Sequence, residues 1–316
     1  QSESVPKSSP AFVSLRTARA LLALQGGRWD EARKELLAAL EAGGPMLHPR
    51  TAIALADAFR KSAVTFEEWA PYAHLSPRSA GEFFSQGVPL SRFKDPKMLA
   101  ALNEKLRREV VLGGWTRAVM LDRWDEAKAL EPQLEAVAPD LAAALAQVKA
   151  REKPEERKMA AVLLLLKSPG VSPYVRPYAV QSPIDYDICS DNGWCAQGAT
   201  DFYKDCDASK GPCDTRFISV EDRRQARQEL QALEKLGKSP ELLIQFTLDY
   251  AKRHPDDALV PEALHESVRQ TRFARNYCGD MDQESKARTE LSKQAFQLLQ
   301  RKYSKTEWAK KTPYYY

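Results

Sequence analysis

Apolar residues in this 316-residue chain recur at spacings of three and four, which places them on one face of an α-helix. Between Ser14 and Ala42 this pattern includes Leu36, Ala39 and Leu40. Gly26-Gly27 interrupts it, so we expect two helices joined by a tight turn. Similar patterns continue to Lys167 and resume after Thr215. The predicted fold class is therefore all-α.

Several predicted helices begin at residues that favour a helix N-terminus. Thr51, Ser76 and Asp95 each precede a helical pattern, and Pro follows two of them directly. We expect Gly237 to end a long polar helix, and Ser239 to cap the helix after it.

Two segments between the helical patterns differ in composition from the rest of the chain. Four prolines within residues 168–183 exclude a helix and predict an extended linker. The residues after it are rich in Asp, Gly and Pro and poor in helix formers. We therefore predict a disordered N-terminus (1–10), an N-terminal helical-repeat region (11–167), a Pro-rich linker (168–183), a Cys/Asp-rich loop insert (184–215) and a C-terminal helical-repeat region (216–316).

The letters RWDEA occur twice, at residues 28–32 and 123–127. In each copy a tryptophan opens a predicted helix, and three places later an alanine allows a neighbouring helix to approach closely. This order of residues resembles the tetratricopeptide family, whose 34-residue helical hairpins stack into a superhelix. The copies are 95 residues apart, which is not a multiple of 34. The resemblance therefore implies an irregular α-solenoid of hairpins, with the Cys/Asp-rich segment as a disulfide-braced loop insert.

A second resemblance covers roughly residues 100–316. AKRHPDDALVPEAL and QRKYSKTEWAKK resemble bacterial periplasmic tetratricopeptide proteins, such as those tied to outer-membrane assembly or the Tol–Pal system. GWTRAVMLDRW, VPEALHESVRQTRF, WAKKTPYYY and the Trp194-Cys195 pair resemble an uncharacterised bacterial family of helical-repeat proteins. This likeness implies that Tyr316 is the true C-terminus, and it carries no catalytic residue or known activity.

Charge and hydropathy narrow the possible partners. The net charge is +4, from 47 basic and 43 acidic residues that are mixed along the chain, so we expect no nucleic-acid binding. The longest apolar run, residues 159–166, is too short to span a membrane. Residues 1–20 lack the pattern of a signal peptide, and we expect a processed N-terminus or a fragment of a longer chain.

The five cysteines point to disulfides. Cys189, Cys195, Cys206 and Cys213 fall within one acidic segment, and Cys278 lies far from it. No C-x-x-C occurs, which disfavours zinc-ribbon, thioredoxin and c-type haem sites. Cross-links would order a segment with few apolar residues, so we expect an oxidising compartment, reduced cytosolic thiols being the alternative. We predict the pairs Cys195–Cys278 and Cys206–Cys213, which leave Cys189 unassigned.

Catalytic and metal-binding patterns are incomplete. His265 starts a sequence like that of zinc proteases, but Arg269 stands where the second histidine is needed. The stretch from Asp205 to Arg216 resembles half of an EF-hand, with arginine in place of the bidentate glutamate. Phosphate-binding glycine loops and nucleophile elbows do not occur in the sequence. We expect no catalysis, no cofactor and no metal.

Aromatic residues provide the candidate interaction sites. Those in the cysteine segment form either a local core packed on disulfides or a recognition surface. A terminal run of three tyrosines would be adhesive if exposed, so we expect it to dock on this chain or on a partner. The candidates are Trp194, Phe202, Tyr203, Tyr314, Tyr315 and Tyr316.

These observations favour an exported, non-catalytic scaffold for protein–protein interaction in the periplasm or at the surface of a bacterium. Stacked hairpins leave a groove that can hold a peptide or a partner protein. Two alternatives remain. One is a structural subunit of a large envelope or extracellular assembly, and the other is an accessory domain of a cell-wall enzyme.

Overall fold

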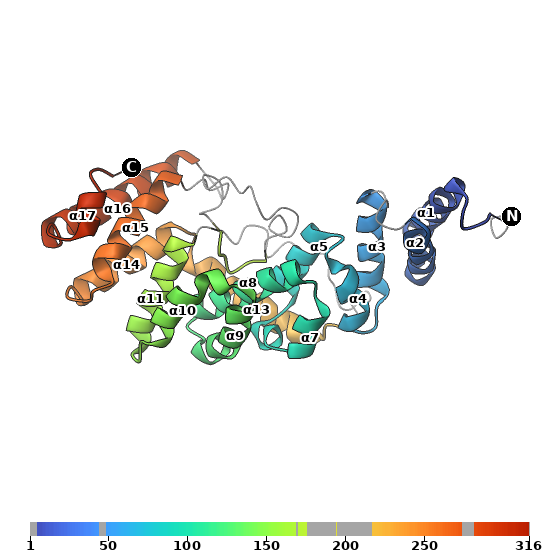
Figure 1. The fold of residues 1–316 in the computed structure, drawn as a ribbon, viewed down its shortest axis with the longest axis horizontal. Helices are drawn as coiled ribbons and strands as arrows, with labels where there is room; N and C mark the ends of the chain where they lie inside the picture. The colour runs from blue at the N-terminus through green and yellow to red at the C-terminus, as the bar shows by residue number, and fades with distance from the viewer. Residues whose placement is uncertain are drawn as a thin grey trace. The chain divides into compact units, whose positions relative to one another are not determined.

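The computed structural model confirms the all-α fold (Figure 1). It describes residues 5–43, 49–168, 170–175, 194, 217–273 and 281–315, and no β-strand forms among them. The helices are α1 (Pro10–Gln25), α2 (Trp29–Gly43), α3 (Pro49–Ser62), α4 (Phe66–Ala73), α5 (Pro77–Glu82), η3 (Phe83–Gly87), α6 (Leu90–Phe93), α7 (Pro96–Ala101), α8 (Glu104–Met120), α9 (Trp124–Val137), η4 (Pro139–Leu141), α10 (Ala142–Lys149), α11 (Pro154–Lys167), α13 (Val220–Leu236), α14 (Glu241–Arg253), α15 (Val260–Phe273), α16 (Met281–Lys302) and α17 (Glu307–Lys311).

The described residues form two compact units. The N-terminal unit holds residues 5–43, 49–109 and 217–226, and the C-terminal unit holds residues 110–168, 170–175, 194, 227–273 and 281–315. This division differs from the predicted regions, which placed the boundary at the Pro-rich linker. The helices before and after that linker share one core, because α11 packs against both α14 and α15.

The first predicted hairpin is confirmed at its turn. Ser9 Oγ accepts a hydrogen bond from the N–H of Ala11 and so caps α1. Gly27 adopts a φ of 70°, the left-handed conformation that ends many helices and that costs glycine little. α1 and α2 then pack through small side chains that let the two backbones approach closely. These fully buried residues are Ala20, Ala23, Ala32, Leu36 and Ala39.

The two RWDEA copies form the same turn. In the first copy, N–H groups donate to carbonyls in the pairs Gly26–Leu22, Gly27–Leu24, Arg28–Ala23 and Ala32–Arg28. In the second copy, the donor–acceptor pairs are Leu121–Arg117, Asp122–Val119, Arg123–Ala118 and Ala127–Arg123. Each bond of the second set lies 95 residues after its counterpart. Asp122, which corresponds to Gly27, also has a positive φ, of 56°. Asp is among the few non-glycine residues that adopt this conformation readily.

This equivalence makes a prediction about Gly27. Replacing Gly27 with Val places a β-branched residue in the left-handed region, and we expect the free energy of unfolding to fall by about 1–2 kcal/mol. Gly27→Asp should cost clearly less, because Asp122 occupies the same conformation in the second turn. Beyond Gly27 and its two chain neighbours, no heavy atom lies within 4 Å of a Cβ built on Gly27, so steric crowding does not contribute to the difference between the two variants. Urea denaturation of the two variants measures the difference, and equal costs would contradict the shared turn geometry.

Some of the predicted helix starts are wrong. α3 begins at Pro49, ahead of Thr51, and Pro240 rather than Ser239 takes the capping position of α14. The prediction for Asp95 is confirmed, since its Oδ1 accepts from the N–H of Lys97 at 3.0 Å. The single helix expected after Asp95 is divided into α7 and α8, because Asn103 Oδ1 accepts from the N–H of Leu106 and starts a new helix.

The core of the N-terminal unit is an aromatic cluster around Trp69 of α4. The Trp69 ring centroid lies 4.8–5.9 Å from those of four phenylalanines. One of them comes from α4, two from η3 and one from the start of the segment that leads into α13. The four are Phe66, Phe83, Phe84 and Phe217. Burial of this size dominates the stability of a small core.

The C-terminal unit is built around α11. All eight residues of the longest apolar run, 159–166, are buried in this helix, which begins at Pro154. Met159 and Leu163 share a cluster with apolar residues of α14, α15 and α16. A helix that is apolar on all sides lies in the interior, as α11 does. Within the described ranges, no helix is both long and apolar enough to cross a bilayer.

Candidate functional site

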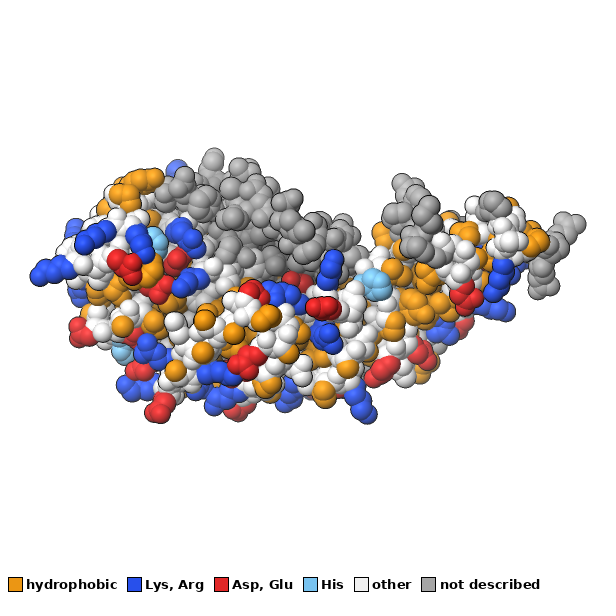
Figure 2. All heavy atoms as spheres, in the orientation of Figure 1, with side chains coloured by type: hydrophobic (Ala, Val, Ile, Leu, Met, Phe, Trp, Pro, Cys, Tyr) orange, Lys and Arg blue, Asp and Glu red, His pale blue; other side chains and the backbone are white. Residues whose placement is uncertain are grey.

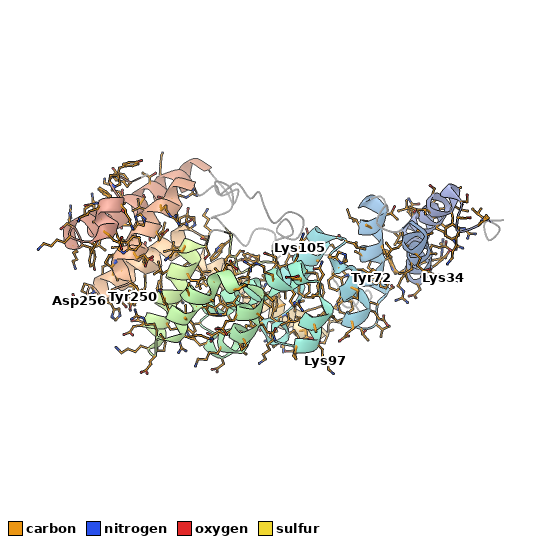
Figure 3. The ribbon with its side chains drawn as sticks, in the orientation of Figure 1. Lys34, Tyr72, Lys97, Lys105, Tyr250 and Asp256 are labelled. Atoms are coloured by element: carbon orange, nitrogen blue, oxygen red, sulfur yellow. The ribbon has the colours of Figure 1, made fainter. Side chains whose placement is uncertain are left out.

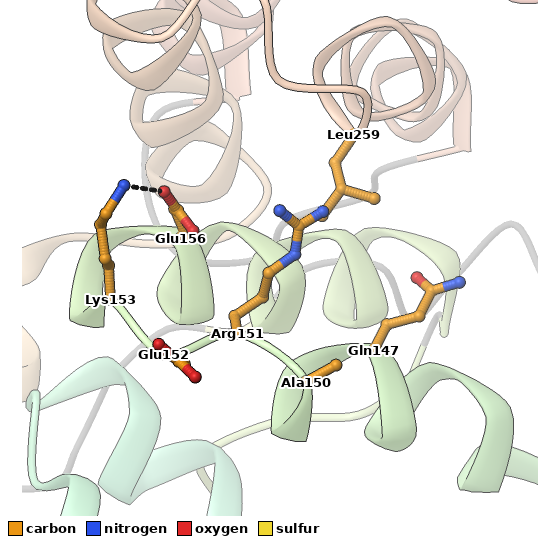
Figure 4. Close-up of a pocket in the computed structure, with 7 residues that line it drawn as sticks. All are labelled: Gln147, Ala150, Arg151, Glu152, Lys153, Glu156 and Leu259. Carbon is orange, nitrogen blue, oxygen red and sulfur yellow. Dashed lines mark hydrogen bonds and ion pairs between the residues drawn. The ribbon is translucent and has the colours of Figure 1, made fainter.

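A surface depression with a volume of about 680 Å³ lies in the C-terminal unit where α10, α11 and the approach to α15 meet (Figure 4). Its walls come from the end of α10, the turn before α11 and the first turn of α11. Figure 4 shows the Arg151 side chain extending toward Leu259, and Lys153 paired with Glu156. The lining residues are Gln147, Ala150, Arg151, Glu152, Lys153, Glu156 and Leu259.

Both basic side chains in this depression lie near carboxylates. Arg151 lies 3.7 Å from a carboxylate oxygen of Asp257, and Lys153 donates to Glu156 at 2.9 Å. The hydrogen bond to Glu156 raises the pKa of Lys153, so the amine stays protonated at neutral pH. A permanently charged amine does not act as a base near neutral pH. Lys153 is therefore not a general base in this depression at neutral pH.

The loop after α14 forms one wall and is held at several points. The Tyr250 hydroxyl donates to Asp257 at 2.6 Å, and Asp257 Oδ1 accepts from the N–H of Leu259. The Tyr303 hydroxyl donates to the carbonyl of Pro255 at 2.7 Å. Burial and the Asp257 carboxylate raise the pKa of Tyr250, which keeps it a hydrogen-bond donor. Figure 3 labels Tyr250 on α14 and Asp256 in the loop that follows it.

Close to the C-terminus, α15 and α17 meet at a histidine–tryptophan contact. The His265 ring centroid lies 5.3 Å from that of Trp308, and its Nδ1 lies 2.7 Å from Thr312 Oγ1. The Thr312 hydroxyl donates its proton to the Trp308 carbonyl, so it accepts from the N–H of His265 Nδ1. Gln300 of α16 donates to the carbonyls of Ala309 and Thr312. These bonds fix the last helix on α15 and α16.

This contact predicts a dependence of stability on pH. Burial, followed by the nearby charges of Arg269 and Lys311, lowers the pKa of His265, while Glu262 opposes the change. The unfolded chain therefore takes up the proton first. The stability that neutral His265 contributes is present above the ordinary value of 6.5 and is lost as the pH falls below it. The slope of unfolding free energy against pH, measured by urea denaturation followed by circular dichroism, should flatten in His265→Gln, and an unchanged slope would contradict this role.

The two terminal tyrosines that the structure describes are partly exposed, and one of them contacts α16. Tyr315 is 40% exposed, and its ring centroid is 5.6 Å from that of Phe296 on α16. Tyr314 is 54% exposed. The last helical segment and its tail thus dock on α16 while two aromatic side chains still reach solvent. Tyr316 lies outside the described residues.

Trp194 is buried, with 7% of its surface exposed. Its carbonyl accepts from the N–H of Ser239 at 3.0 Å, and the two residues form an antiparallel bridge. Trp194 also borders a small cavity together with Leu166 of α11 and Leu243 of α14. The side chain is not presented to solvent as a recognition surface would be, and the predicted packing on disulfides stays a prediction because the cysteines lie outside the described residues.

The other predicted sites of the loop insert lie outside the described residues. They are Phe202, Tyr203, Cys189, Cys195, Cys206 and Cys213, together with Cys278. The predicted pairs Cys195–Cys278 and Cys206–Cys213 therefore stay predictions. In the part of the chain that is described, no group of three or more His, Cys, Asp or Glu side chains is arranged to hold a metal ion.

A buried ion network in the C-terminal unit was not predicted. Arg117 of α8 and Glu229 of α13 are fully buried and lie 3.7 Å apart. Glu229 also accepts from Arg123 at 2.8 Å, and Arg117 Nε donates to the Pro173 carbonyl at 3.3 Å. Burial lowers the pKa of Arg117, and Glu229 opposes that change. The sequence signal was an arginine inside the apolar stretch that ends α8.

Comparison of this chain with known proteins gives no match. No protein-family model, no characterised protein and no solved structure matches this chain significantly. Its function therefore has to be inferred from its own residues and their arrangement.

Proposed function

We propose that this chain is a non-catalytic helical-repeat scaffold, similar to tetratricopeptide-like arrays, which binds a protein partner in the bacterial envelope. The observation that carries the proposal is the pair of identical hairpin turns, whose backbone hydrogen bonds recur 95 residues apart. Recurrence of both the bonds and the left-handed residue indicates a duplicated helix-turn-helix unit. Such units stack into arrays that offer extended surfaces for binding.

The exposed apolar side chains support a binding role. Two of them, Leu21 and Leu22, are neighbours on α1, and the others are spread over both units. Figure 2 shows hydrophobic side chains in orange at the surface among charged ones. Adjacent exposed apolar residues, such as the two leucines of α1, favour contact with another protein, whereas isolated ones carry no such signal. The large exposed ones are Leu21, Leu22, Ile53, Val64, Val220, Leu236, Tyr314 and Tyr315.

Location in the envelope rests on the cysteine chemistry of the sequence. An acidic, Gly- and Pro-containing segment with four cysteines is typical of oxidising compartments. Peptide mapping without reduction is expected to find Cys195 joined to Cys278, and Cys206 joined to Cys213. Five free thiols in protein purified from its native host would refute the export, while leaving the scaffold proposal standing.

Site-specific photo-crosslinking tests the scaffold. A photoreactive residue is placed in turn at Lys34, Lys97, Lys105 and Asp256, four exposed positions labelled in Figure 3. In native cells we expect one protein to be captured at a subset of these positions and not at the rest, as a defined contact surface requires. Capture at none of these positions would refute the scaffold proposal. Turnover of a small molecule that one substitution abolishes would also refute it.

A further inference from the structure

The depression at the turn between α10 and α11 contains an arginine whose side chain donates no hydrogen bond to any described residue. Arg151 lies 3.7 Å from a carboxylate oxygen of Asp257, which is an ion pair beyond hydrogen-bonding distance. Its side chain is 29% exposed, and Figure 4 shows it extended toward Leu259. A guanidinium has five N–H donors. These donors are therefore available to a group that enters the depression.

Asp257 fixes the position of Arg151 without using its donors. One oxygen of Asp257 accepts from the Tyr250 hydroxyl at 2.6 Å, and the other accepts from the N–H of Leu259 at 2.9 Å. The backbone of Arg151 is also held, because its carbonyl accepts from Arg157 Nε at 3.0 Å. The guanidinium thus stays in place beside a carboxylate that is bonded elsewhere, and its planar fork matches the two oxygens of a ligand carboxylate.

The other charges decide which kind of ligand fits. Lys153 donates to Glu156 at 2.9 Å, so these two charges offset each other, as those of Arg151 and Asp257 do. Glu152 also lines the depression, and its carboxylate has no ion pair or hydrogen bond among the described residues. These five side chains together carry one net negative charge. They disfavour a phosphate or another multiply charged anion, and they favour a ligand that carries both a carboxylate and a cationic group.

The uncharged part of the lining matches a short peptide. Ala150 and Leu259 provide apolar surface, and the side-chain amide of Gln147 is both a donor and an acceptor. A peptide has the corresponding groups in its apolar side chains and its backbone amides. The volume of about 680 Å³ lies within the range of pockets that hold small ligands.

We propose that this depression binds a short free peptide as a zwitterion, with the terminal carboxylate on Arg151 and the terminal ammonium on Glu152. An apolar side chain of the peptide contacts Leu259, and Gln147 pairs with a backbone amide. This site goes beyond the scaffold role, which requires a protein partner, and either proposal can fail without the other.

Equilibrium dialysis of the full chain against an equimolar mixture of free tripeptides tests the site, and mass spectrometry identifies the peptides retained. We expect retention of tripeptides with aliphatic side chains. Arg151→Gln should weaken it by about tenfold or more, because the carboxylate loses its charged, two-point contact. The matched control is Lys149→Gln, which removes a neighbouring cation bonded to Glu135 outside the lining and should bind like the parent chain. Circular dichroism checks that both variants keep their helices.

Modified peptides test the two ends of the ligand without altering the protein. Amidation of the C-terminus should weaken binding as much as Arg151→Gln does. Acetylation of the N-terminus should weaken binding to the parent chain but not to Glu152→Gln, which has no carboxylate left to meet the ammonium. Retention of no tripeptide at millimolar concentration would overturn the proposal. So would binding that amidation leaves unchanged, or inorganic phosphate that binds more tightly than the peptides do.

Discussion

Replacing Glu229 with Gln is expected to lower the free energy of unfolding by about 3–5 kcal/mol. The carboxylate is the negative partner of Arg117, which has no solvent-exposed surface, and it also binds Arg123. Without it, the positive charge of Arg117 stays buried, and the Pro173 carbonyl to which Arg117 donates carries no compensating charge. A buried charge that loses its counter-ion costs far more than a surface pair does.

The same helix supplies a matched control. Glu221 of α13 pairs with Arg224 on the surface, and 68% of its side chain is exposed. Glu221→Gln should change the free energy of unfolding by less than about 0.5 kcal/mol. Urea denaturation followed by circular dichroism compares the two variants. Similar values for both would show that Glu229 does not compensate a buried charge.

A double replacement separates charge compensation from packing. Arg117→Met with Glu229→Leu removes both charges and keeps most of the apolar volume. We expect it to be much more stable than Glu229→Gln, because replacing a whole buried pair by apolar residues is often neutral or stabilising. If the double variant is less stable than the single one, packing shape rather than charge governs this site.

Replacing Trp69 with Ala is expected to cost about 3–5 kcal/mol in the N-terminal unit. Trp69 is fully buried, and its ring contacts Phe83, at 4.8 Å, and three other phenylalanines. Removing it forfeits the buried apolar area and leaves a cavity that rigid rings cannot fill. Thermal unfolding followed by circular dichroism measures the loss.

The control for Trp69 is an exposed aromatic residue. Tyr314 is 54% exposed, so Tyr314→Ala should change stability by less than about 0.5 kcal/mol. Trp69→Phe should recover part of the loss, because a smaller ring still occupies the site. A Trp69→Ala variant as stable as Tyr314→Ala would mean that the aromatic cluster is not the core of this unit.

The sequence predicted helix ends correctly where the residue at the end favours the backbone conformation found there. Gly26-Gly27 and Gly237 end helices because glycine adopts positive φ at little cost, and both Gly27 and Gly237 do so. Pro154 starts α11 because a proline in the first turn leaves no hydrogen bond unmade. The apolar run 159–166 lies in this helix, and the helical pattern that continues to Lys167 predicted it as a helix.

Prediction failed where a neighbouring element decides the outcome. α4 was not among the predicted helices; Pro71 lies inside it, and its buried aromatic side chains pack in the core of the unit. Ser239 does not cap α14, because its backbone pairs with Trp194. The aromatic cluster joins Phe217 to residues near position 69, a distance along the chain that local patterns do not span.

The sequence by itself determined the helical class, the hairpin turn and its second copy, because φ preferences and spacings of three or four act within a few residues. Only the tertiary structure decided which faces of those helices are covered. Arg117 and Leu22 occupy equivalent positions, yet one is buried beside Glu229 and the other is 62% exposed. Burial depends on segments far away in the chain, such as residues 172–175 and α13, and no local pattern specifies where those segments come to lie.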